Sequence, residues 1–94
     1  MKRIEKKVQS KYFESVLNGK KRYEIRLADF DYQAGDTLIL KEQKDGTTEL
    51  TGRELETEIL QHINTKEAEK FWSKEDIEKY GLLVLSIRRK YNYD

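Results

Sequence analysis

Short strand-like segments separated by turn residues recur along this 94-residue chain, and this pattern constrains the fold more than any other feature. Residues 22–27 alternate charged with apolar side chains, the period of a strand with one buried face. Residues 37–42 and 82–87 carry consecutive apolar side chains, which predicts strands covered on both faces or a strand in a closed barrel. The last of these is the most apolar run in the chain and predicts a central strand that extends toward Tyr91.

Weaker patterns add two further strands, at residues 3–8 and 53–63. The second of these is rich in Glu and Leu, so a helix is the rival interpretation. Its strict alternation without apolar spacings of three and four favours a strand. Asp45-Gly46 predicts a tight hairpin turn before it, and Thr51-Gly52 predicts a second turn or a bulge.

Two to three short helices complete the prediction. Residues 11–18 predict a helix of about two turns with Ser10 as its N-cap and Gly19 as a left-handed residue at its end. Residues 65–80 predict helix in two pieces, with Gly81 ending the second. Thr65 and Ser73 are the expected N-caps of the two pieces. Ala68, Phe71 and Trp72 are expected to be buried, with Trp72 packing the helix against the barrel.

Strands at short spacing with a few helices predict one α+β domain over residues 1–94. The expected architecture is a small mixed β-barrel of about five to six strands, or a strongly bent sheet, with two to three short flanking helices.

Composition excludes several classes of site. The chain has no cysteine and one histidine, which leaves no disulfide framework, no thiolate metal site and no histidine cluster. We therefore expect no metal and no cofactor. No apolar run is long enough to span a membrane, so we expect no membrane association and a cytoplasmic protein. The net charge of +1 argues against a protein that coats DNA, although basic residues cluster near both ends and in residues 20–26.

The segment Gly19–Arg26, which we call the signature, carries the candidate chemistry. Arg26 offers a planar fork for phosphate, Lys21 offers a point charge, and Glu24 can orient either or accept a proton. Strand alternation places Glu24 and Arg26 on one face and Lys21 on the other, unless the chain turns just after Gly19. The alternative interpretation is a Glu24–Arg26 ion pair that only stitches the structure together.

The signature fits the pattern G-x-K-x-x-E-x-R and resembles that of the ASC-1 homology (ASCH) domain, a member of the PUA-like superfamily. Matching segments flank it in the same order, including Tyr12-Phe13-Glu14, Leu38-Ile39-Leu40 and Thr51-Gly52-Arg53-Glu54. The resemblance implies a PUA-like mixed barrel and an RNA-binding module of a small bacterial or phage subfamily. One branch of the family deacetylates a modified cytidine with a Lys at the position of Lys21 and a Thr where this chain has Glu24, so that activity is not carried over.

Three functions follow from these observations. The first is RNA or nucleotide binding without catalysis, in a cleft formed around the signature, with Arg88, Arg89 and Lys90 as an extension of this groove. The second is hydrolysis of modified nucleosides or RNA with Lys21 and Glu24 as the catalytic pair. The third is a protein-interaction module. For all three functions we expect the chain to be a monomer or a weak dimer. The expected ligand-binding residues are Lys20, Lys21, Glu24, Arg26, Arg53 and Tyr32, the last as a stacking platform for bases.

Overall fold

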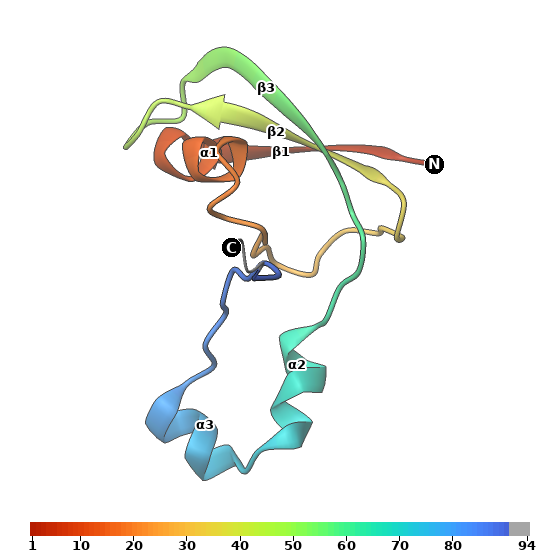
Figure 1. The fold of residues 1–94 in the computed structure, drawn as a ribbon, viewed down its shortest axis with the longest axis vertical. Coiled ribbons are helices and arrows are strands. Elements are labelled where there is room, and N and C mark those ends of the chain that lie inside the picture. The colour runs from red at the N-terminus through yellow and green to blue at the C-terminus, as the bar shows by residue number, and fades with distance from the viewer. Residues whose placement is uncertain (91–94) are drawn as a thin grey trace, which may run out of the picture.

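The computed structural model describes residues 1–90, which form an open three-stranded sheet, one helix packed on it, and a projecting helical segment (Figure 1). The elements in chain order are β1 (Arg3–Gln9), α1 (Ser10–Leu17), β2 (Thr37–Gln43), β3 (Leu50–Glu58), α2 (Thr65–Ala68), the 3-10 turn η1 (Glu69–Phe71) and α3 (Lys74–Tyr80). We call residues 1–59 the sheet half and residues 60–90 the arm.

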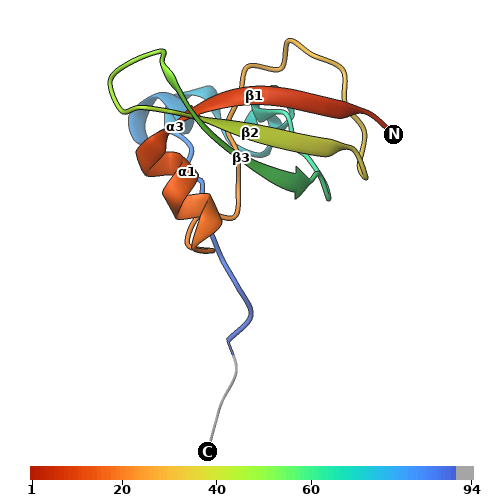
Figure 2. The same cartoon turned by 90° about the horizontal axis from the view of Figure 1, so that it is seen from above.

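The sheet has the order β1-β2-β3, with β1 parallel to β2 and β2 antiparallel to β3 (Figure 2). Helix α1 and the long segment 18–36 make the crossover between the parallel strands, which a parallel pair requires. In the register, Ile4 lies opposite Leu38, and Leu40 lies opposite Leu55. These four apolar residues therefore share the face of the sheet that α1 covers.

The core is small and lies between this face and α1. Its buried members are Val8, Phe13, Leu38 and Leu40, and partly buried apolar side chains surround them. Ile39 is buried on the opposite face, where its strand neighbours are Glu5 and Glu56. Ion pairs lie around it on that face: Arg3–Glu56, Lys41–Glu5 and Lys41–Glu54.

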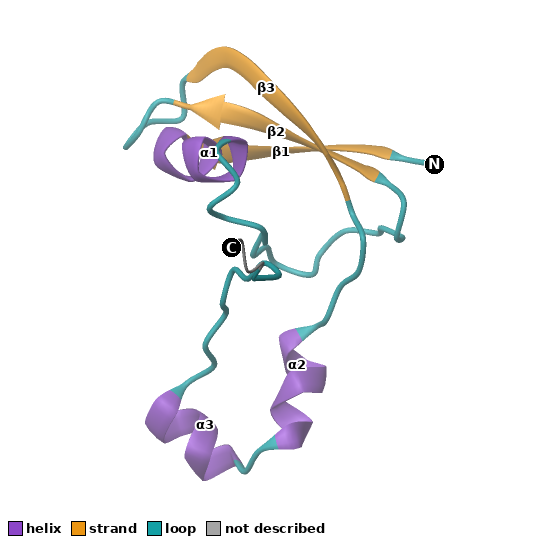
Figure 3. Cartoon of the chain, in the orientation of Figure 1, coloured by secondary structure: helices purple, strands orange, loops and turns teal. Residues whose placement is uncertain are grey.

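The predicted barrel of five to six strands is wrong, because the sheet is open and has three strands. Residues 22–27 and 82–87 form no strand (Figure 3). Where they meet, the backbone N–H of Arg22 donates to the Ser86 hydroxyl at 2.8 Å instead of to a strand carbonyl. An apolar pattern gives a segment a face to bury, but a strand also needs a neighbouring strand whose backbone groups are free to hydrogen-bond with it. The predicted extension of the last strand toward Tyr91 lies outside the described residues.

The other strand predictions are confirmed with shifted bounds. β1 and β2 each end one residue later than predicted, and β3 runs over Leu50–Glu58 where residues 53–63 were expected. Strand is therefore correct for residues 53–58, and helix is not. The bulge near Thr51-Gly52 is also confirmed, since the β2–β3 register shifts between Lys41 and Gln43 and Gly52 has a φ of 95°.

The helix caps differ in part from the prediction. Gln9 occupies the N-cap position of α1, and the Ser10 hydroxyl instead donates to Glu42 at 2.8 Å. Asn64, one residue before the predicted Thr65, caps α2 by accepting from the Lys66 N–H. The Ser73 cap is confirmed, because its hydroxyl accepts from the Asp76 N–H at 3.1 Å.

The arm projects away from the sheet and buries none of its side chains (Figure 1). Phe71 is 72% exposed and Trp72 is 56% exposed, so the prediction that they are buried against the sheet is wrong. Their rings contact each other edge to face, with centroids 5.9 Å apart. No helix within residues 1–90 has the length and apolar character to cross a membrane.

Candidate functional site

The end of α1 turns the chain sharply into the signature. Gly19 has a φ of 79°, and its N–H donates to the Val16 carbonyl at 3.1 Å. The Lys21 N–H then reaches back to the Ser15 carbonyl at 2.8 Å. Only a residue without a Cβ adopts this left-handed conformation at no steric cost, so Gly19 is what folds Lys21 back toward the helix.

This turn brings the three charged signature residues together. The Lys21 ammonium lies 2.8 Å from one Glu24 oxygen, and the Arg26 Nε lies 2.7 Å from the other. The side chains of Lys21 and Glu24 are largely covered, at 14% and 18% exposure. The turn just after Gly19, which Lys21 needs in order to join Glu24 and Arg26 on one side, is therefore present, and so is the Glu24–Arg26 ion pair.

Arg26 also fastens the signature to the sheet. Its Nη2 donates to the Lys7 carbonyl at 2.6 Å, on the edge strand β1. Edge strands carry unpaired carbonyls that invite pairing with other chains, and a guanidinium blocks this one. Lys21, Glu24 and Arg26 thus form a staple between the end of α1 and β1, in which both oxygens of the single carboxylate are occupied.

Next to this staple, residues from segments 18–22 and 86–88 line a cationic cleft. It has a volume of about 380 Å³, and it opens between the end of α1 and the last described residues of the arm. Its lining residues are Asn18, Gly19, Lys20, Arg22, Ser86, Ile87 and Arg88. Three of them are cations and none is a carboxylate, so the lining of the cleft is positively charged.

Two of these cleft cations were predicted from the sequence as candidate site residues, and the third, Arg22, was not. Lys20, predicted as a ligand-binding residue, and Arg88, predicted to extend the groove, both line the cleft. Arg22 was assigned to the charged face of a strand and was not chosen as a site residue. Its position follows from the turn at Gly19, and its Nε donates to the Gly19 carbonyl at 3.2 Å.

Arg53 lies in a different cluster, between α1, β2 and β3. Its guanidinium donates to Glu42 at 2.9 and 2.7 Å, also contacts Glu14, and stacks over the Phe13 ring at 4.9 Å. The hydrogen bonds from Arg53 and then Thr51 lower the pKa of the Glu42 carboxyl from 4.5 to about 2. The hydrogen bond with Glu42 in turn raises the pKa of Arg53. These bonds commit Arg53 to holding three elements together.

Tyr32 also lies outside the cationic cleft. It is half-buried, with its ring 4.9 Å from the His62 ring in an edge-on contact and 5.4 Å from the Phe30 ring. The Lys6 ammonium sits 4.0 Å above the Phe30 ring. Tyr32 therefore packs the crossover segment against the start of the arm.

The described residues offer no metal centre, since no group of three or more His, Cys, Asp or Glu side chains in residues 1–90 is arranged to hold an ion. One buried carboxylate, Asp36, has a structural role. It accepts the backbone N–H groups of Lys2 at 3.0 Å and Gln33 at 2.9 Å, and these bonds lower the pKa of its carboxyl.

The fold and cleft define a small α+β domain with a cationic surface site. The chain belongs to the family described as "Domain of unknown function (DUF3850)", whose model matches residues 5–87. It is also similar to the "Uncharacterized 12.9 kDa protein in GpA 3'region" of Escherichia phage P2, with 51% identity over 55 residues. That match covers 58% of this chain and 49% of the phage protein, so it spans about half of the relative's length. No solved structure matches the chain.

Proposed function

We propose that this domain binds RNA or a nucleotide and holds its phosphate groups in the cationic cleft. The observation that carries the proposal is the meeting of Lys20, Arg22 and Arg88 around one cavity without a carboxylate. Lysine and arginine without acidic neighbours attract phosphate strongly, and such contacts dominate the affinity of nucleic-acid binding.

The size and polarity of the cleft support this function. A volume of about 380 Å³ falls within the range of small-ligand sites. Asn18 adds an amide and Ser86 adds a hydroxyl to its lining, and both groups can hydrogen-bond a sugar or a base edge. The resemblance of the signature to that of ASCH domains points to the same class of ligand.

The signature residues have a supporting role in this proposal. Lys21 and Arg26 are engaged with Glu24, so they position the backbone from which Lys20 and Arg22 reach the ligand. Substituting Arg26 would then weaken binding by loosening the cleft rather than by removing a phosphate contact.

The test is the affinity for fluorescently labelled single-stranded RNA, measured by anisotropy across a series of salt concentrations. Lys20→Ala and Arg88→Ala should each weaken binding about 3- to 10-fold and lower the slope of log K against log salt by about one. Lys44→Ala, in the hairpin away from the cleft, removes the same charge and should change the affinity less than about twofold. Equal losses in all three variants, or no binding at low salt, would contradict the proposal.

The alternative is a hydrolase of modified nucleosides or RNA that uses Lys21 and Glu24 as its catalytic pair. Their 2.8 Å contact is the observation in its favour. A general base must reach a substrate proton, however, and both Glu24 oxygens are already occupied by cations. The geometry therefore favours binding. Turnover of a modified nucleoside or RNA that is lost in Lys21→Ala, with RNA affinity retained, would reverse this preference.

A further inference from the structure

We propose that the chain forms a stable homodimer in which the arm of one copy packs against the arm of a second. The first observation is the amount of exposed surface. A compact protein of 11.3 kDa exposes roughly 5,700 Å², whereas this chain exposes 8253 Å². Its radius of gyration is 15.8 Å, against about 12 Å for a compact domain of this length.

The excess has the size of a permanent interface. Roughly 2,500 Å² per chain lies above the compact value, and obligate dimers bury roughly 2,000–5,000 Å² in total. The apolar part of this exposed surface is unfavourable in a lone small domain, because each Å² of apolar area left in water costs about 25 cal/mol.

The exposed apolar side chains are concentrated in the arm, which holds ten of the sixteen exposed large apolar residues of the described chain. No residue between 60 and 90 is buried, whereas every buried residue of the described chain lies in the sheet half. Helices α2 and α3 have four and seven residues. Helices this short are not stable alone in water and need an apolar face to pack on. The sheet does not supply that face, since the arm projects from it (Figure 1).

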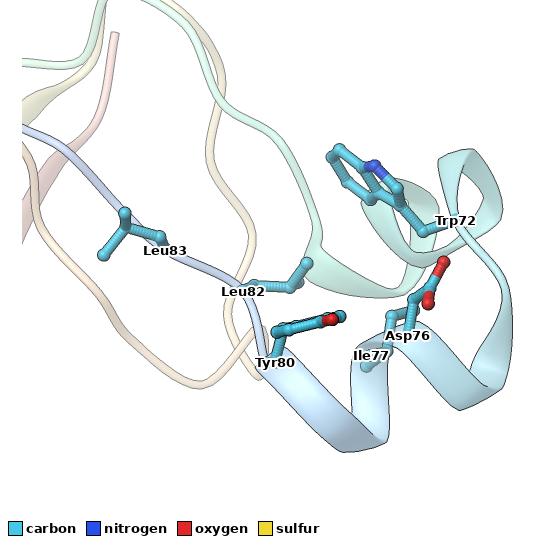
Figure 4. A pocket seen from close by; sticks show the side chains of 7 residues that line it. Trp72, Asp76, Ile77, Tyr80, Leu82 and Leu83 are labelled. Carbon is cyan, nitrogen blue, oxygen red and sulfur yellow. The ribbon is translucent and has the colours of Figure 1, made fainter.

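The arm contains a pocket and an anchor that suit each other. The pocket has a volume of about 370 Å³ and opens between Trp72, Ile77, Tyr80 and Leu82, with Asp76 at its rim (Figure 4). Phe71, beside it, does not line it and is 72% exposed. In a two-fold dimer each surface meets its own copy, so Phe71 of each chain would enter the pocket of the other.

The charges of the arm permit this contact with a second copy. Residues 66–79 carry four lysines and five carboxylates, so the arm presents charges of both signs that a second copy can pair with. The net charge of +1 per chain also produces little repulsion between copies. The arm pocket shares no residue with the cationic cleft, and the dimer would therefore carry two accessible clefts.

Sedimentation velocity of the full chain tests the dimer, between about 5 and about 100 μM, where a micromolar dimer would be seen to dissociate. Wild type should sediment with twice the 11.3 kDa chain mass, and Phe71→Glu should sediment as the monomer with an unchanged circular dichroism spectrum. Leu50→Glu places the same charge on an exposed leucine of β3 and should remain dimeric. A monomeric wild type overturns the proposal, as does a dimer that Phe71→Glu leaves intact.

A second measurement locates the interface without weakening it. The chain contains no cysteine, so Lys70→Cys and Thr48→Cys each give one site for a spin label. Pulsed dipolar spectroscopy should show a short distance between the two copies for the label at residue 70 and a much longer one for the label in the β2–β3 hairpin. The reverse order would place the interface on the sheet half and overturn the proposal.

Discussion

The sheet half and the arm carry similar side chains but differ in what those side chains contact. In the sheet half, α1 and three strands cover Phe13 and Leu40 almost completely. In the arm, Leu83 is 81% exposed although it lies in the most apolar run of the chain. The difference shows that an apolar pattern gives a segment side chains that could be buried, and that they are buried only where another element packs against them.

Charged groups follow the same division. In the sheet half, Arg53 bridges Glu42 and Glu14 across three elements, and Arg26 fastens the crossover to β1. In the arm, Ser73 caps α3 locally by accepting from the Asp76 N–H. The two regions meet at Arg22 and Ser86, and the cationic cleft opens there.

The sharpest way to break this comparison is a matched pair of leucine truncations. Leu40→Ala removes a side chain that is 2% exposed in the core and should lower the free energy of unfolding by about 3 kcal/mol. Leu60→Ala, at the start of the arm and 76% exposed, should lower it by less than about 0.5 kcal/mol. Urea unfolding followed by circular dichroism measures both, and losses of similar size would show that the arm is as much a part of the core as the sheet.

A smaller effect is expected from acid. The pKa of Glu42 is about 2 in the folded protein and 4.5 ordinarily, so its ionised form stabilises the fold above about pH 4.5. That contribution is lost as the pH falls toward 2. Glu42→Gln should lower the urea midpoint at neutral pH, and its difference from wild type should shrink as the pH falls from 4.5 toward 2.

The control for this titration lies in the arm. Glu69→Gln removes an exposed carboxylate and should leave the dependence of the midpoint on pH unchanged. Part of the acid sensitivity should survive in Glu42→Gln, because backbone N–H bonds also lower the pKa of Asp36. An unchanged pH dependence in Glu42→Gln would mean that the buried cluster does not couple to folding.

The smallest expected effect separates the two regions by hydrogen exchange. Ser73→Ala removes the cap of α3, worth about 1 kcal/mol, and should speed exchange of the α3 amides about fivefold. The β2 amides should not change. Ser10→Ala, which removes a hydroxyl that donates to Glu42, should speed exchange in the sheet and leave α3 unaffected. Faster exchange in both regions from either variant would show that they unfold together.

The sequence allowed the local elements of the sheet half to be predicted because their signals are local. Alternation located β1 and β3, the apolar run located β2, and Gly19 marked the end of α1. The pattern at 82–87 could not predict whether these residues form a strand, because a strand requires a neighbouring strand to hydrogen-bond with. The same limit affected Arg53, whose carboxylate partner Glu42 looked like one more charged residue of a strand.

For the site, the sequence predicted a cleft around the charged signature, with Arg88 as part of an extended groove, but it did not indicate which distant segment would form the far wall. The far wall of the cleft comes from Ser86 and Arg88, more than sixty residues away along the chain. The turn at Gly19 and the hydrogen bond from Arg22 to Ser86 bring those walls together. The contact between distant segments turns scattered basic residues into one candidate binding site.

The most direct test of this account is an NMR titration of the isotope-labelled full chain with single-stranded RNA at low salt. We predict that the largest amide shifts fall on both walls of the cleft, at Gly19, Lys20 and Arg22 on one side and Ser86 and Arg88 on the other, and that they disappear at high salt. Shifts that fall on α3 or on the outer face of the sheet, with the cleft residues unmoved, would contradict it.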